Sequence, residues 1–97
     1  MSLVCDFCRQ PDPTVEYPCK DVQLPGYLDS FGPWCACEVC AMLITMDDRE
    51  ALARRAEVMT GVPEDTNRTV QALFFLARTG KARPIKLTPM HGRFFQR

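Results

Sequence analysis

The 97-residue sequence has a single histidine, no net charge and no long apolar run. Its most apolar stretches, residues 39–46 and 70–77, are far shorter than the roughly 20 residues that a membrane helix needs. No secretory signal is visible, because the N-terminal residues MSLVCDFC lack a basic start, an apolar run and a small-residue cleavage site. We therefore expect a soluble, cytoplasmic protein whose thiols are reduced.

The signatures of several enzyme classes are also missing. The sequence contains no phosphate-binding glycine loop, no H-E-x-x-H pair and no G-x-S-x-G elbow. The single histidine, His91, stands in a basic segment, where we expect a solvated side chain rather than a catalytic base. These absences argue against an enzyme and direct attention to metal binding and surface recognition.

Six cysteines stand out in an otherwise average composition. Hydrophobic residues make up 46% and charged residues 25% of the chain, values that are typical of a globular domain. A chain of this length forms one domain and buries only about two thirds of its unfolded surface. A bound metal would therefore add useful stability to a modest core.

Four of the cysteines form two C-x2-C pairs, Cys5 with Cys8 and Cys37 with Cys40, and 28 residues separate the pairs. Paired C-x2-C motifs are a strong metal signature, because two thiolates on one tight turn bind a tetrahedral ion and a second pair completes its coordination. We predict that these four residues hold a structural Zn²⁺. Four thiolates close the shell and leave no position for a catalytic water, which again argues against an enzyme.

Other uses of the cysteines stay open. Disulfides would need an oxidising compartment that the sequence does not indicate, an iron–sulfur cluster is compatible with four thiolates, and neither pair has the βαβ setting of a redox motif. Cys35 stands two residues before Cys37, on the opposite side of an extended strand, so we expect it to pack as a small apolar group, with replacement of Cys37 as ligand the alternative. Cys19 is expected to be a buried free thiol.

Turn residues and alternating apolar residues predict an α+β fold. Residues 15–24 have the alternation of short strands, and turn signals at Pro25-Gly26 and at residues 31–33 predict one hairpin and a loop that leads to Trp34. A helix beginning at Glu38 places Cys37 just before it and the last cysteine in its first turn. Its expected apolar stripe consists of Val39, Met42, Leu43 and Met46.

Two more helices are expected. Asp47 is the predicted N-cap of the second helix, with Glu50 completing a capping box and Gly61 ending the helix. Pro63 suits the first turn of the third helix, which Gly80 closes. The expected apolar stripes are Leu52, Ala56 and Met59 on the second helix, and Val70, Leu73, Phe74 and Ala77 on the third.

The order of these elements predicts the organisation of the chain. A cysteine knuckle, a hairpin and a second C-x2-C pair at a helix N-terminus are the elements of a treble-clef-like or ribbon-like zinc finger. We expect a zinc-binding unit over residues 1–46, a helical pair packed on it over residues 47–80, and a basic tail over residues 81–97. All three are expected to form one compact domain.

Further residues accompany the cysteine pairs: Cys5-Asp6-Phe7-Cys8, Pro11, Tyr17-Pro18, Trp34, Leu43-Ile44, Asp48 and Leu52-Ala53-Arg54-Arg55. With them, residues 5–55 resemble small, largely uncharacterised zinc-finger-like proteins of actinobacteria and their phages. The resemblance implies zinc at the two cysteine pairs and no settled activity, and Cys19 and Cys35 depart from the family's usual pattern. It also suggests a phage or mobile-element protein that interferes with a host protein.

The neutral net charge hides an asymmetry. Residues 1–48 hold 2 basic and 8 acidic side chains, whereas residues 49–97 hold 10 basic and 4 acidic ones. We expect a protein-interaction or regulatory module, with a homodimer as one form of partner; the alternative is a nucleic-acid-binding zinc finger that uses the basic C-terminal half. The side chains expected to contact a partner or phosphate are Arg54, Arg55, Arg68, Arg78, Lys81 and Arg83.

Overall fold

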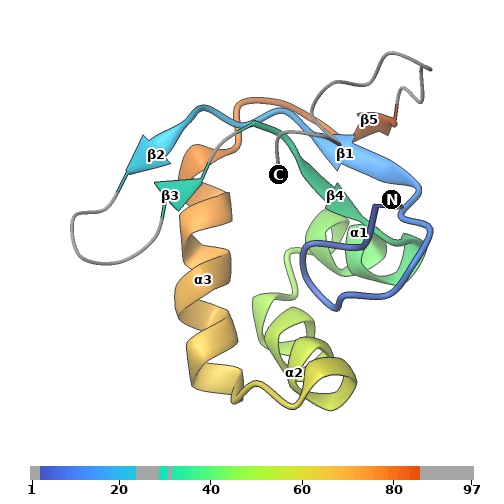
Figure 1. Ribbon diagram of the computed structural model, residues 1–97, viewed down its shortest axis with the longest axis vertical. Helices are drawn as coiled ribbons and strands as arrows, with labels where there is room; N and C mark the ends of the chain where they lie inside the picture. The colour runs from blue at the N-terminus through green and yellow to red at the C-terminus, as the bar shows by residue number, and fades with distance from the viewer. Residues whose placement is uncertain (1–2, 24–28, 31, 86–97) are drawn as a thin grey trace.

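The computed structural model describes residues 3–23, 29–30 and 32–85 (Figure 1). It has the predicted α+β architecture, and the predictions for Leu24, for Pro25-Gly26 and for the tail beyond residue 85 lie outside the described residues. The elements follow one another as β1 (Val15–Tyr17), β2 (Val22–Gln23), β3 (Asp29–Ser30), β4 (Trp34–Ala36), α1 (Glu38–Thr45), α2 (Arg49–Thr60), α3 (Glu64–Ala77) and β5 (Arg83–Pro84).

The strands form a hairpin with an added edge strand. β1 pairs antiparallel with β4 and β2 pairs antiparallel with β3, so the chain runs out along β1 and β2 and returns along β3 and β4 (Figure 1). The predicted hairpin is therefore present, and Trp34 begins β4. β5 pairs with the other edge of β1, where Arg83 stands opposite Glu16. The first part of the predicted basic tail is thus a strand of the sheet.

Local capping residues set the helix boundaries, and two of the predicted boundaries need correction. Cys37 is the N-cap of α1, as predicted, and Gly61 ends α2 in the left-handed conformation, with a φ of 80°. The N-cap of α2 is Asp48 rather than Asp47, because the carboxylate of Asp48 accepts a hydrogen bond from the N–H of Ala51. Asp47 instead has a φ of 55° and lies in the turn between α1 and α2.

The end of α3 is the second correction. The helix stops at Ala77, before Gly80, because Arg78 takes an extended conformation. Arg78 forms an isolated antiparallel β-bridge with Cys19, which follows β1. The N–H of Lys20 also bonds to the carbonyl of Ala77, at 2.9 Å. Pairing with a distant segment therefore ends α3 before Gly80, the end that the sequence predicts. No helix in the described part of the chain is long and apolar enough to cross a membrane.

The predicted apolar stripe of α1 is wrong. Val39, Met42 and Met46 are 40%, 52% and 64% exposed, whereas Cys40 and Ile44 are buried. The two buried residues are four apart and lie on one face of the helix. Since Cys40 faces the other cysteines, that face points inward and most of the predicted stripe points out.

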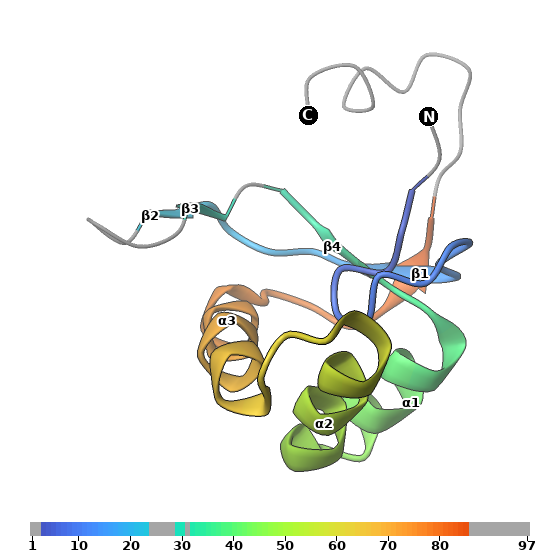
Figure 2. The same ribbon diagram turned by 60° about the horizontal axis from the view of Figure 1, so that its bottom comes forward.

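A cluster of aromatic side chains joins α3 to the hairpin and to the first cysteine pair. Phe74 is fully buried, and its ring centroid lies 4.9 Å from that of Phe7 and 5.3 Å from those of Tyr17 and Trp34. Its neighbour Phe75 is only half-buried. The three helices lie on one side of the hairpin (Figure 2), so this cluster fills the space between the layers.

Candidate metal centre

The sulfur atoms of Cys5, Cys8, Cys37 and Cys40 all lie within 4.8 Å of one another, and all four residues are buried. The sulfurs of Cys8 and Cys37 are 3.7 Å apart. A tetrahedral site with metal–sulfur bonds of about 2.3 Å places its sulfurs about 3.8 Å apart. The structure thus brings the four predicted cysteines together with the spacing of a four-thiolate metal site.

Backbone hydrogen bonds shape the first cysteine pair into a tight turn. The N–H of Cys5 bonds to the carbonyl of Gln10 at 2.8 Å, and the N–H of Arg9 bonds to the carbonyl of Cys5 at 2.9 Å. Arg9 closes the turn with a φ of 66°, a left-handed conformation that favours glycine. The turn brings the sulfurs of Cys5 and Cys8 to the same side.

The second cysteine pair begins α1. Cys37 caps the helix, and its sulfur accepts a hydrogen bond from the N–H of Cys40 at 3.5 Å. Both sulfurs therefore lie at the N-terminal end of α1, where the helix dipole is positive.

Asp6 holds the two pairs against each other. Its N–H bonds to the carbonyl of Cys35 at 2.9 Å, and its carboxylate accepts a hydrogen bond from the N–H of Cys35 at 2.6 Å. Cys35 lies in β4, two residues before Cys37. The reciprocal bonds between Asp6 and Cys35 therefore fix the first turn beside the strand that leads into α1.

The thiols influence one another's ionisation. A hydrogen bond with Cys40 lowers the pKa of Cys5 to about 4, and the same bond raises the pKa of Cys40. Burial raises the pKa of Cys8. Holding all four as thiolates requires a cation, so metal binding at this site releases protons and strengthens as the pH rises.

Arg55, on α2, faces the cysteine cluster. Its Nη2 atom donates to the sulfur of Cys37 at 3.9 Å. Burial lowers the pKa of Arg55, but hydrogen bonds to Cys40 and Cys37 more than offset this and raise it. Its Nε atom is buried without a hydrogen-bond partner among the described residues. Arg55 follows the buried Leu52 by three residues and so lies on the same side of α2. That spacing could have predicted a contact with the core.

The other basic residues predicted to contact a partner have varied surroundings. Arg54 pairs with Glu50 at 2.6 Å and with Glu64 at 3.6 Å. Arg83 pairs at 2.9 Å with the buried carboxylate of Glu16. The remaining three are exposed and form no ion pair with a described residue: Arg68, Arg78 and Lys81.

The two surplus cysteines lie outside the cluster of four. Cys35 is fully buried in β4, consistent with the expected apolar packing. Cys19 is half-buried, less than expected, and its sulfur donates a hydrogen bond to the carbonyl of Tyr17 at 3.5 Å. Neither is disulfide-bonded.

Comparison with known proteins gives no family for this arrangement. No protein-family model, no curated protein and no solved structure matches the chain. The resemblance of residues 5–55 to zinc-finger-like proteins of actinobacteria and phages therefore stays a prediction.

Proposed function

We propose that this chain is a structural zinc protein without catalytic activity. The observation that carries the proposal is the buried group of four sulfurs, all within 4.8 Å of one another. Soft thiolates in a tetrahedral set select zinc or an iron–sulfur cluster, and the isolated C-x2-C pairs on a knuckle and a helix N-terminus favour zinc. The order of knuckle, hairpin and helix supports a treble-clef-like finger. Four thiolates fill the shell, so the ion stabilises the fold.

The protein's proposed activity is recognition of a protein partner. The outward face of α1 supports this, because Val39 and Met42 on the helix and Met46 directly after it expose apolar side chains. Exposed apolar groups mark protein contacts more often than phosphate contacts, and methionine adapts easily to a partner's shape. A regulatory role, interference with a host protein by a phage or mobile element, rests on the resemblance alone.

Nucleic-acid binding is the alternative function. It would use the basic side chains of the C-terminal half. Arg54 and Arg83 bind carboxylates of the same chain, and Arg55 lies against the thiolates, so half of the six predicted contacts already have partners. This observation favours the protein partner.

Metal analysis tests the zinc proposal. Protein purified without chelator should contain one equivalent of zinc per chain, and Cys37→Ser should lose both the zinc and the structure of the N-terminal unit, since metal binding and folding are linked in such domains. Cys19→Ser is the matched control, because it removes a thiol that lies outside the cluster. Less than about half an equivalent of zinc, or iron with visible absorbance in its place, would refute the proposal.

Two binding experiments separate the partners. Affinity for random duplex DNA that falls steeply between about 50 and 200 mM salt would support nucleic-acid binding. If the protein does not bind the DNA even at low salt, this function is excluded. Capture of the same host protein by the wild type, lost in Met42→Glu and kept in Val58→Glu, would support the proposed face of α1. Val58 is a suitable control because it is exposed on α2.

A further inference from the structure

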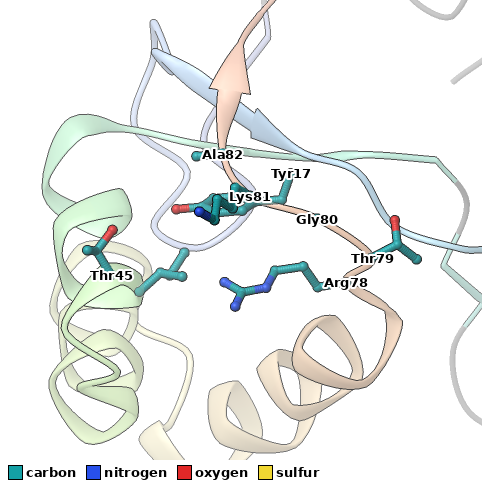
Figure 3. A pocket seen from close by; sticks show the side chains of 8 residues that line it. Tyr17, Thr45, Arg78, Thr79, Gly80, Lys81 and Ala82 are labelled. Carbon is teal, nitrogen blue, oxygen red and sulfur yellow. The ribbon is translucent and has the colours of Figure 1, made fainter.

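A cavity of about 630 Å³ lies apart from the cysteine cluster. Its walls are Tyr17 of β1, the last residues of α1, and the segment 78–82 that connects α3 to β5 (Figure 3). Its volume falls within the range of small-molecule sites. None of the cysteines lines it.

The wall formed by residues 78–82 is held in place by the hairpin. Both the N–H and the hydroxyl of Thr79 bond to the carbonyl of Pro18, at 2.8 and 3.2 Å. Gly80 packs so closely on the same proline that a Cβ atom would stand 2.8 Å from its ring. The bridge between Cys19 and Arg78 fixes the start of the segment. The backbone of this segment is therefore preorganised.

Two unpaired positive charges line this cavity. Arg78 and Lys81 form no ion pair with a described residue, and none of the eight lining residues is acidic. Figure 3 shows the Arg78 side chain extending from its segment toward α1, which carries Thr45. Its guanidinium also lies 5.8 Å from the centroid of the Tyr17 ring. The C-terminal end of α1, whose partial negative charge is smaller than two full positive charges, opposes an anion here, and so does the negative charge of Cys40, which acts on Tyr17. Cys40 does not line the cavity, whereas Arg78 and Lys81 do.

Tyr17 adds an independent indication of a ligand. The residue is 2% exposed, and its hydroxyl is buried without a hydrogen-bond partner among the residues that the structure describes. Buried polar groups almost always have a partner, so an exception on a cavity wall needs an explanation. Burial raises the pKa of Tyr17, which keeps the hydroxyl protonated and able to donate.

We propose that this cavity binds the phosphate monoester of a small molecule. A phosphate monoester carries a charge of about −1.5 to −2 at neutral pH, which two cations match, whereas a carboxylate carries half as much. Tyr17 and Thr45 line the same cavity, and each carries a hydroxyl group that can donate a hydrogen bond. The cavity is much larger than a phosphate group, and the side chains of Ile44 and Ala82 give the organic part an apolar wall. The site uses no zinc ligand, so this proposal and the proposed zinc function can each fail alone.

The test is a titration of the full-length, zinc-loaded protein with inorganic phosphate and with phenyl phosphate, followed by the backbone amide signals in NMR spectra. We expect saturable shifts at residues 45 and 78–82, and tighter binding of phenyl phosphate than of inorganic phosphate or benzoate. Arg78→Ala and Lys81→Ala should each weaken phenyl phosphate binding at least about fivefold, since each removes a charge-assisted hydrogen bond. Arg68→Ala is the matched control, because Arg68 is exposed on α3 and does not line the cavity.

Tyr17→Phe probes the buried hydroxyl. We expect phenyl phosphate to bind about two- to fivefold more weakly, with the melting temperature of the free protein unchanged or higher, because the variant removes an unpaired buried group. A purely structural tyrosine would leave the affinity unchanged, and that result would overturn the role of its hydroxyl. Equal weakening by Arg68→Ala, or binding of an oligonucleotide without binding of phenyl phosphate, would overturn the proposal itself.

Discussion

The Nη2 atom of Arg55 lies 3.9 Å from the sulfur of Cys37 and donates to it, although the two residues are 18 positions apart in the sequence. Four thiolates around Zn²⁺ would carry a net charge of −2, which is costly in a buried site. The guanidinium neutralises part of that charge and joins α2 to the proposed metal centre. Helix α2 and the cysteine cluster are thereby coupled electrostatically as well as by packing.

Replacing Arg55 should weaken zinc binding. Arg55→Met keeps the length of the side chain and removes its charge, so we expect zinc affinity about tenfold lower, as is usual when an outer partner of a metal ligand is lost. Competition with a chromophoric chelator measures it. Arg54→Met is the matched control, since Arg54 pairs with Glu50 on the exposed side of the same helix. Equal zinc affinity in the two variants would contradict the role of Arg55.

The cysteine site could be predicted because its signal is local. A C-x2-C pair encodes a tight turn by itself, and a cysteine followed by an uninterrupted helical segment encodes a cap, so the structure brings together the four predicted residues. The end of α2 at Gly61 is local in the same sense. The sequence alone places Arg55 among the surface arginines, because its contact with Cys37 depends on how α2 packs against the start of α1.

Other features depend on contacts between distant segments. The sequence of α1 offers two apolar faces, and the position of Cys40 selects the one that carries Ile44. β5 has only two residues, one of them Pro84, so alternation cannot reveal it, and its place follows from pairing with β1. Helix α3 stops before Gly80 for the same reason, because the segment that follows joins the hairpin.

Cys35 should prove dispensable for metal binding. It is fully buried but lies outside the group of four sulfurs, so Cys35→Ala should keep one equivalent of zinc and lower the free energy of unfolding by about 1 kcal/mol, the cost of a small cavity. Cys37→Ala should lose the metal. Zinc analysis and urea unfolding of both variants measure the difference. Loss of zinc from Cys35→Ala would show that Cys35 belongs to the metal site.

The ion pair between Arg83 and Glu16 should anchor β5. Glu16 is buried, and its carboxylate lies 2.9 Å from the guanidinium. We expect Arg83→Ala to lower the free energy of unfolding by about 2 kcal/mol, less than for a fully buried pair because Arg83 is half exposed. Urea unfolding of the zinc-loaded protein measures it, and Lys81→Ala, two residues away and without an ion pair, is the control.

The double variant Glu16→Gln/Arg83→Ala separates charge from packing. Removing the buried carboxylate should recover part of the stability lost in Arg83→Ala, because that single variant takes away one partner of a buried negative charge. No recovery would mean that Arg83 acts through strand pairing alone.

Arg9 occupies a backbone position that suits glycine. Its φ of 66° closes the first cysteine turn, and its side chain is exposed. The left-handed conformation costs a residue with a Cβ atom about 1–2 kcal/mol, while glycine makes the unfolded chain more flexible, so the net gain for Arg9→Gly should be about 0.5–1 kcal/mol. Urea unfolding at fixed free zinc measures this gain.

Asp12→Gly is the comparison for that gain. Asp12 also has a positive φ, 57°, but aspartate tolerates this region better than arginine, so the stabilisation should be smaller. Because the turn at Arg9 orients Cys5 and Cys8, Arg9→Gly should also strengthen zinc binding, whereas Asp12→Gly lies outside the turn and should not. A loss of stability in Arg9→Gly would mean that the exposed arginine contributes contacts worth more than the backbone strain.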